Sequence, residues 1–331
     1  MSRMRPPAVI IVNHNTRAAL RESIAAATSE HAREVVVVDN ASSDGSVAMV
    51  RGAFPGVVVV ANASNRGYGP AANQGMALIA GPFAVLLNGD ACLEAGALAA
   101  LGRLLDEQLD VAVVGPRLLN EDGSLQSSCY AFPGSLRWIL DNDVLAPLNR
   151  LVPFVRGRFL RTWRHDRERR VPWIKGAAMA IRRSAFDAVG GFDESFPLFY
   201  EETDLCHRLG GAGWRVLFSP AATVHHSGGA STGDREADVS LQLFAGQVQF
   251  FQRYSPRLQM LWTLMLKALE IPSLFCDSVR LLLTRRADRR AVLARRIAER
   301  WRKLRLDRHR PDAAWRAAVD GRMAPRPVSS A

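Results

Sequence analysis

The stretch EVVVVDNASSDGSVAMVRGA, residues 34–53, decides the fold. Four consecutive valines lead to Asp39, and a helical pattern follows the polar turn. A strand that is apolar at every position is buried on both faces, which is typical of a parallel sheet covered by helices. The same order of apolar run and helix recurs through the first half of the chain, with runs at 8–12, 56–61, 82–88 and 110–115. We therefore predict an α/β domain with a mostly parallel central sheet flanked by helices.

Polar residues directly follow these predicted strands, with Asn13 after the first and Asp39 after the second. Ligands of such sheets bind beyond the carboxyl ends of the strands. Asp39 could accept a hydrogen bond from a pyrimidine ring N–H or a ribose hydroxyl, or its loop could simply cap the next helix through residues 42–44. No G-x-G-x-x-G loop follows the first strand, which disfavours a nicotinamide-dinucleotide fold.

The strongest local signal is LLNGDACLEAG, residues 86–96, where an apolar strand runs into Asn88-Gly89-Asp90. An aspartate at the carboxyl end of a strand can bind Mg²⁺ or Mn²⁺, which in turn holds a diphosphate. Asn-Gly is also typical of hairpin turns, but the following residues have a helical pattern, which favours the metal site. A hairpin is expected instead at LLNEDGSLQ, with its turn at 122–123.

Three carboxylates, Glu201, Glu202 and Asp204, stand at the start of a predicted helix over about 201–212, in FYEETDLCHRLG. Acidic residues in a first turn complement the helix dipole, but a carboxylate at a site edge can also act as a general base. The pair His225-His226 follows a further predicted strand. Such a pair is either structural or a source of imidazole metal ligands.

Composition limits the class of protein. The chain has 331 residues, of which 48% are hydrophobic, and a formal net charge of +11. This hydrophobic content supports a buried core, and the positive charge suggests anionic partners such as phosphorylated ligands, nucleic acid or anionic lipid. The four cysteines are far apart and form no CxxC pair, which predicts reduced cysteines in the cytoplasm. The apolar run at 8–12 is too short for a signal-peptide core.

The sequence changes character at about residue 256. An apolar segment at 258–283 is interrupted by charged residues, so a membrane-spanning helix is not expected, and an arginine-rich helix follows. We expect a catalytic domain over 1–255 and a basic, amphipathic helical region over 256–331. This region either contacts an anionic membrane surface or packs as a helical pair on its own domain or on a dimer partner.

An ordered set of short motifs over residues 8 to about 253 resembles the family 2 glycosyltransferases, and among them the rhamnosyltransferase-like branch. The resemblance implies a GT-A fold, a nucleotide-sugar donor, a divalent metal and inversion at the anomeric carbon. The motifs are VIIVNHN, VVVVDNASSDGS, NRGYGPAANQG, LLNGDA, DGSLQSS, WIKGAAMAIRRSAFDAVGGFDESFPLFYEETDLCHRL and HHSGGAS.

The resemblance also implies roles for single residues. Asp90 would bind Mg²⁺ or Mn²⁺, with His226 beside it and His225 as a rival ligand. Glu202 would be the general base, with Glu201 and Asp204 orienting it or capping the helix. The residues expected at the nucleotide sugar are Asn13, Asp39, Asn65, Gly67, Asn73, Asn88, Trp173 and Gly176.

These roles together predict an inverting, metal-dependent glycosyltransferase. The resemblance favours rhamnose from dTDP-rhamnose as the donor, moved to a glycan or lipid-linked acceptor during synthesis of cell-surface polysaccharide, and it leaves UDP-linked galactofuranose, glucose or other sugars open. We expect it in the cytoplasm, peripheral on the inner face of the membrane. Two departures stand out: Asn88 replaces the first acid of the family's D-x-D element, and Glu202 stands where Asp is more usual.

The alternative is a non-catalytic nucleotide-sugar-binding protein that has lost the first D-x-D acid. Nucleic-acid binding is disfavoured as the main role because of the ordered acidic site, and an oligomer stays open.

Overall fold

The computed structural model describes residues 6–135, 138, 163–196, 198–228, 236–284 and 287–305. Residues 229–231 of the motif HHSGGAS and the end of the predicted basic helix after Arg305 lie outside this described part.

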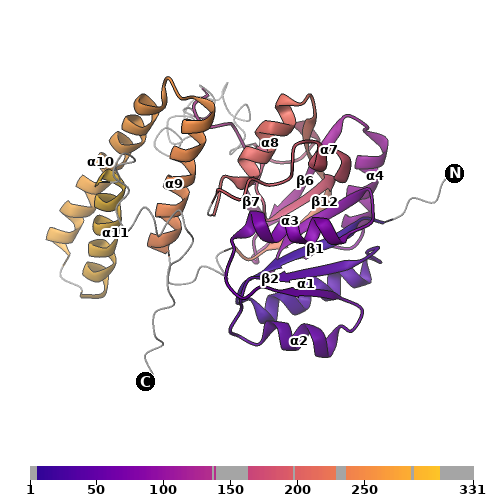
Figure 1. The fold of residues 1–331 in the computed structure, drawn as a ribbon. Coiled ribbons are helices and arrows are strands. Elements are labelled where there is room, and N and C mark those ends of the chain that lie inside the picture. The colour runs from indigo at the N-terminus through magenta and orange to yellow at the C-terminus, as the bar shows by residue number, and fades with distance from the viewer. Residues whose placement is uncertain are drawn as a thin grey trace. The chain divides into compact units, whose positions relative to one another are not determined.

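A mixed ten-stranded sheet organises the first part of the chain (Figure 1). Its main order is β3-β2-β1-β4-β11-β6-β12-β5, with β7 paired to β6 and β9 paired to β12. Strands β8 and β10 form a separate two-stranded sheet. The strands are β1 (Ala8–Asn13), β2 (Val35–Asp39), β3 (Val58–Ala61), β4 (Phe83–Asn88), β5 (Ala91–Leu93), β6 (Val111–Leu119), β7 (Leu125–Gln126), β8 (Cys129–Tyr130), β9 (Arg169–Arg170), β10 (Trp173–Ile174), β11 (Ala178–Arg182) and β12 (Arg215–His226).

The predicted α/β architecture is confirmed. Strands β3, β2, β1 and β4 pair in parallel, and β12 runs parallel to β6. Between these groups β11 runs antiparallel to both β4 and β6. The predicted hairpin is also confirmed, because β6 and β7 pair antiparallel on either side of Gly123, whose φ is +76°.

Helices cover both faces of the sheet. The helices are α1 (Arg17–Ser29), α2 (Ser46–Ala53), α3 (Tyr68–Leu78), α4 (Ala97–Glu107), α7 (Arg183–Ala188), α8 (Glu201–Gly211), α9 (Glu236–Tyr254), α10 (Gln259–Leu283) and α11 (Ala287–Arg305). Alternate residues of β1 enter two separate cores: Ile10 packs with residues of α3, α7 and α8, whereas Ile11 packs with residues of α1, α2 and α4. This alternation explains why the strand is apolar throughout.

The chain divides into two compact units. Among the described residues, the first unit extends to Glu194 and resumes from Glu201 to Gly228. The second contains Ser195, Tyr200 and the residues between them that are described, together with α9, α10 and α11. Helix α9 therefore groups with the C-terminal helices, although the sequence placed the domain boundary after it; the two-domain division stays a prediction. Within the described part, no helix is both long enough and apolar enough to cross a membrane.

A close approach between α3 and β1 depends on Gly75. A Cβ at Gly75 would lie 2.3 Å from Ile10 Cγ2, so we expect Gly75→Ala to lower the free energy of unfolding by about 1–3 kcal/mol. In an Ile10→Ala background the added methyl group enters vacated space, and the cost of Gly75→Ala should fall to near zero. Urea unfolding of the four proteins measures this coupling.

Gly52 provides the control, because a Cβ there meets no atom within 4 Å. Gly52→Ala should stabilise the protein by up to about 1 kcal/mol, since alanine is the better helix former. Equal effects at both glycines would contradict the packing argument.

Candidate active site

The carboxyl ends of β1 and β2 meet at one edge of the sheet, where Asn13 pairs with Asp39. Asn13 Nδ2 donates to Asp39 Oδ2 at 2.7 Å. Ser42 donates to the same carboxylate from its backbone N–H at 2.8 Å and from its hydroxyl at 2.6 Å. The structure thus brings Asn13 and Asp39 together, and it uses Asp39 to hold the loop after β2. A contact from Asp39 to a nucleotide base stays a prediction.

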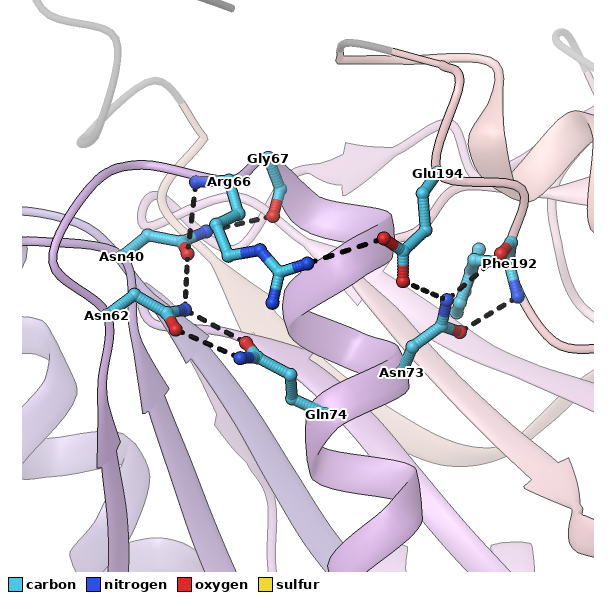
Figure 2. A network of polar contacts seen from close by, with 8 residues as sticks. All are labelled: Asn40, Asn62, Arg66, Gly67, Asn73, Gln74, Phe192 and Glu194. Carbon is cyan, nitrogen blue, oxygen red and sulfur yellow. Dashed lines mark hydrogen bonds and ion pairs between the residues drawn. The ribbon is translucent and has the colours of Figure 1, made fainter.

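Figure 2 shows a polar network that ties the start of α3 to the segment before α8. Asn73 Nδ2 donates to Phe192 O at 3.0 Å and to Glu194 Oε1 at 3.1 Å, and the Phe192 N–H donates back to Asn73 Oδ1 at 2.9 Å. Arg66 Nη2 pairs with Glu194 Oε2 at 3.4 Å. Asn73 was expected at the nucleotide sugar, but both ends of its amide bind the Phe192 backbone. Its geometry supports a positioning role for the segment that leads to α8.

The loop before α3 contains Asn65 and Gly67. Asn40 Nδ2 donates to Gly67 O at 2.9 Å, and Asn62 Nδ2 donates to Asn40 Oδ1 at 3.0 Å (Figure 2). Asn65 is exposed, and its Oδ1 accepts the Gly67 N–H at 2.9 Å. Gly67 has φ +89°, a conformation that favours glycine. Asn40 and Asn62 therefore hold this loop in place, and the Asn65 side chain stabilises its turn.

Gly89 sets the direction of the turn between Asn88 and Asp90. Its N–H donates to Val12 O at 2.8 Å, and a Cβ would lie 2.5 Å from Thr16 Oγ1 and 2.6 Å from Asn13 Oδ1. The three-residue strand β5 follows this turn and pairs with β12, which excludes the hairpin alternative, and the expected helix comes after it as α4. Asp90 is only 7% exposed, and its Oδ1 lies 3.4 Å from His226 Nε2.

The alternation of β12 separates the two neighbouring histidines. His226 is buried and lies beside Asp90 and Asn88, with Asn88 Nδ2 3.2 Å from its Nε2. His225 is half-exposed and contacts Glu94 Oε1 at 2.6 Å through its Nε2. The structure brings His226 to Asp90 and does not bring His225 there, because successive side chains of a strand point to opposite faces.

Gln126 fixes the orientation of His226. Its Nε2 donates to Asn120 Oδ1 at 2.7 Å and to His226 O at 3.2 Å. Its Oε1 therefore faces Lys175 Nζ at 2.9 Å and His226 Nδ1 at 2.7 Å. The reverse orientation would set the amide NH₂ against a lysine ammonium, which only donates. The His226 Nδ1 therefore carries a hydrogen, and Nε2 faces the side chains of Asn88 and Asp90.

This donor set fits a divalent cation. A carboxylate is an ordinary ligand of Mg²⁺ or Mn²⁺, and an imidazole whose other nitrogen is held by a second residue can add a nitrogen ligand to a transition metal such as Mn²⁺. The described residues gather no cluster of three or more histidine, cysteine or acidic side chains that could hold an ion. Further ligands would come from diphosphate oxygens and water, in keeping with Asn88 at the first D-x-D position.

The three acids of α8 lie in different environments. Asp204 is fully buried and pairs with Arg208 at 2.7 Å, and Arg208 also donates to Val189 O. Asp204 therefore anchors the helix. Glu201 and Glu202 are 5% and 7% exposed, and the Glu202 carboxylate accepts the N–H groups of Gly176 and Thr203.

Burial raises the pKa of both glutamates, so Glu202 departs from the value of an ordinary glutamate. The pKa of Glu201 lies well above the usual range, through burial and then the repulsion of Glu202. For Glu202, backbone N–H groups and the Lys175 ammonium offset part of the raised pKa caused by burial. Two adjacent buried carboxyls share their protons, so we assign the negative charge to Glu202 and the proton to Glu201.

Lys175 connects the two halves of the site, and the sequence analysis missed it. Burial lowers the pKa of Lys175, while the charges of Glu202 and then Asp90 raise it again. Its neighbour Gly176 accepts the Tyr68 hydroxyl at 2.9 Å. Trp173 donates from Nε1 to Ala131 O at 2.9 Å and stacks on Tyr130 at 4.6 Å. The motif WIKGA, which was predicted to lie at the sugar, thus also brings a cation within electrostatic range of Glu202 and Asp90.

Residues 5–244 match the family described as "Glycosyltransferase like family 2". The chain therefore belongs to this family and is a transferase enzyme, as its motifs predicted. It is 31% identical over 220 residues to the N-acetylglucosaminyl-diphospho-decaprenol L-rhamnosyltransferase of Mycobacterium tuberculosis, an alignment of 62% of this chain and 70% of that relative.

Two solved structures share the fold. One is GalNAc-T7 with UDP, GalNAc and Mn²⁺, with a TM-score of 0.55 and 17% identity. That alignment covers 76% of this chain but only 48% of GalNAc-T7. The other is the mannosyltransferase PcManGT from Pyrobaculum calidifontis with GDP-Man and Mn²⁺, with a TM-score of 0.50 and 19% identity over 92% of this chain and 88% of that one. The predicted GT-A fold is confirmed.

The raised pKa of Glu201 predicts a pH-dependent stability. A carboxyl whose pKa rises on folding stabilises the protein fully below its unfolded pKa, and this stabilisation is lost as the pH rises through the folded pKa. Glu201→Gln removes the cost of ionisation, so at pH 8 it should raise the melting temperature by at least about 2 °C. The difference should shrink toward pH 5.

Glu121→Gln is the matched control, because Glu121 is exposed. It should leave the melting temperature nearly unchanged at both pH values. A gain for Glu201→Gln that is equal at pH 5 and pH 8 would refute the assignment of the proton.

Proposed function

We propose that this chain is an inverting, metal-dependent glycosyltransferase that moves rhamnose from dTDP-rhamnose to a lipid-linked glycan acceptor in cell-surface polysaccharide synthesis. One observation carries the proposal: Gln126 contacts both His226, beside Asp90, and Lys175, whose pKa is lowered by burial and raised in part by the charges of Glu202 and then Asp90. This arrangement sets a site for the leaving diphosphate beside a carboxylate that can accept a proton.

The proposed donor site lies at the carboxyl ends of β1, β2 and β4. Asp90 Oδ1 and His226 Nε2 would hold the cation, and Gln126 orients the imidazole by binding its Nδ1. When bound, Mg²⁺ or Mn²⁺ would neutralise part of the charge on the leaving nucleoside diphosphate. The two solved structures that contain Mn²⁺ with UDP or GDP-Man support this choice of cofactor and donor class.

Glu202 is the proposed general base. Its carboxylate takes the proton of the acceptor hydroxyl while that oxygen forms a bond to the anomeric carbon, and the bond to the diphosphate breaks on the opposite face. A pKa raised by burial brings Glu202 closer to the working pH and makes it a stronger base than an ordinary glutamate. Glu201, which holds a proton, keeps a second negative charge away from the reaction.

Lys175 is proposed to bind the diphosphate oxygens. It stands between two acids, and its ammonium can supply charge that the Asn88 site would otherwise lack. Its bond to Gln126 Oε1 holds the amine in place without neutralising it. An ammonium group binds phosphate as a point charge.

The sugar and the acceptor are proposed from the relative. Its printed name describes transfer of L-rhamnose to N-acetylglucosaminyl-diphospho-decaprenol, which is a lipid-linked glycan. The same class of acceptor, a sugar on a lipid diphosphate, is our proposal for this chain.

Glu202→Gln tests the base directly. The amide keeps the size of the side chain and removes its basicity, so rhamnose transfer should fall by about 10²–10⁴. Affinity for dTDP should stay within about twofold, because the base binds no part of the nucleotide in this mechanism. Release of dTDP from dTDP-rhamnose with a lipid-linked acceptor and Mn²⁺ is the assay, repeated with EDTA.

Glu201→Gln is the matched comparison, and it should keep most of the turnover, since an amide resembles the protonated acid. Near-normal transfer by Glu202→Gln would overturn the assignment of Glu202 as the general base. Metal-dependent release of the nucleoside diphosphate from a different nucleotide sugar would overturn dTDP-rhamnose as the donor. Intact dTDP binding without release, whichever donor and acceptor are supplied, would favour a binding protein.

A further inference from the structure

Helix α10 exposes one continuous apolar face. The exposed large apolar side chains recur at helical spacing, and the exposed Arg280 lies near the C-terminal end of the same helix; the apolar set is Met260, Leu261, Leu264, Ile271, Phe275, Val279, Leu282 and Leu283. We call this set the apolar stripe. The exposed fractions of its side chains are large: 74% at Met260, 68% at Phe275 and 82% at Leu282. Scattered exposed apolar residues need no explanation, but a row of eight along one helix indicates an interaction surface.

An ion network fixes the opposite face of α10 against α11, so the stripe faces outward. Arg300 pairs with Glu270 and, at 3.2 Å, with Asp277, which is only 4% exposed. Lys303 Nζ lies 3.1 Å from Glu270 Oε1. Breaking a buried pair leaves an uncompensated charge and costs several kcal/mol. The helix therefore cannot turn to bury the stripe on α11.

The inner face is apolar as well as charged. Leu266 and Leu274 are buried, and Trp262 stacks on Phe251 of α9 with ring centroids 5.8 Å apart. In Figure 1, α10 and α11 run side by side. These inner-face contacts form the core of this unit, and the residues of the apolar stripe take no part in it.

The charge beside the stripe selects the partner. Helix α11 contains eight arginines and lysines against two acids, and Arg289, Arg295, Arg296 and Arg302 are among its exposed residues. A second copy of the chain would bring a second basic helix and repel the first. An anionic lipid surface offers an apolar interior for the stripe and negative headgroups for the arginines.

We propose that α10 lies in the plane of an anionic bilayer, with the apolar stripe among the acyl chains and α11 supplying electrostatic attraction. This inference rests on the C-terminal helices alone and is independent of the proposed reaction. It would place a glycosyltransferase at the surface where lipid-linked acceptors are found.

Vesicle sedimentation of the full chain tests the proposal. Wild-type protein should pellet with vesicles of equimolar phosphatidylglycerol and phosphatidylcholine, and binding should weaken in high salt. The double variant Leu264→Glu, Phe275→Glu should bind at least about tenfold more weakly, because it puts two charges on the face that would lie among the acyl chains. Leu282→Glu with Leu283→Glu is a second variant at the far end of the stripe.

Leu109→Glu is the matched control, since Leu109 is an isolated exposed leucine that belongs to the first unit and is 75% exposed. It should bind like wild type, and all variants should keep the wild-type melting temperature. Wild-type protein that stays in the supernatant, or folded stripe variants that bind normally, would overturn the proposal. A wild-type dimer that dissociates in the stripe variants without any vesicle binding would assign the stripe to self-association instead.

Discussion

The proposed site depends on the four hydrogen bonds that the side-chain amide of Gln126 makes. Its NH₂ group must face Asn120 and the His226 carbonyl, so its oxygen must face Lys175 and His226 Nδ1. This single group therefore sets the tautomer of the histidine and the position of the ammonium. A half-buried amide that makes four hydrogen bonds is costly to disturb, because each lost partner can leave a polar group unpaired.

A second constraint is the burial of two adjacent glutamates at the start of α8. Neither the helix dipole nor local capping accounts for it, since the dipole acts equally on exposed acids. The segment before α8 is tied to α3 through Asn73 and Glu194, and Tyr68 holds Gly176 against the same region. Contacts from α3 and from the segment of Gly176 thus support the region in which Glu201 and Glu202 are buried.

Much of this was predictable from the sequence. The valine-rich run before Asp39 gave the parallel sheet, because only doubly covered strands are apolar throughout, and strand ends placed Asn13, Asp39 and Asn88 at one edge. The antiparallel direction of β11, the three-residue β5 and helix α9 were missed, since pairing direction and very short strands leave little local pattern. Lys175 and Gln126 were missed because the contacts that join Gln126 to Lys175 and to His226 span 49 and 100 positions of the sequence. A role of Asn73 at the ligand stays a prediction, and its bonds to the Phe192 backbone, 119 positions away, leave no local pattern.

The central claim is that His226 Nε2, and not His225, faces the cation beside Asp90. Pulsed electron paramagnetic resonance of Mn²⁺ bound to the full chain with dTDP measures it directly, because a nitrogen ligand couples to the manganese electrons. The account predicts a nitrogen coupling that persists in His225→Ala and disappears in His226→Ala. A coupling lost in His225→Ala, or one absent from wild-type protein with Mn²⁺ bound, would contradict it.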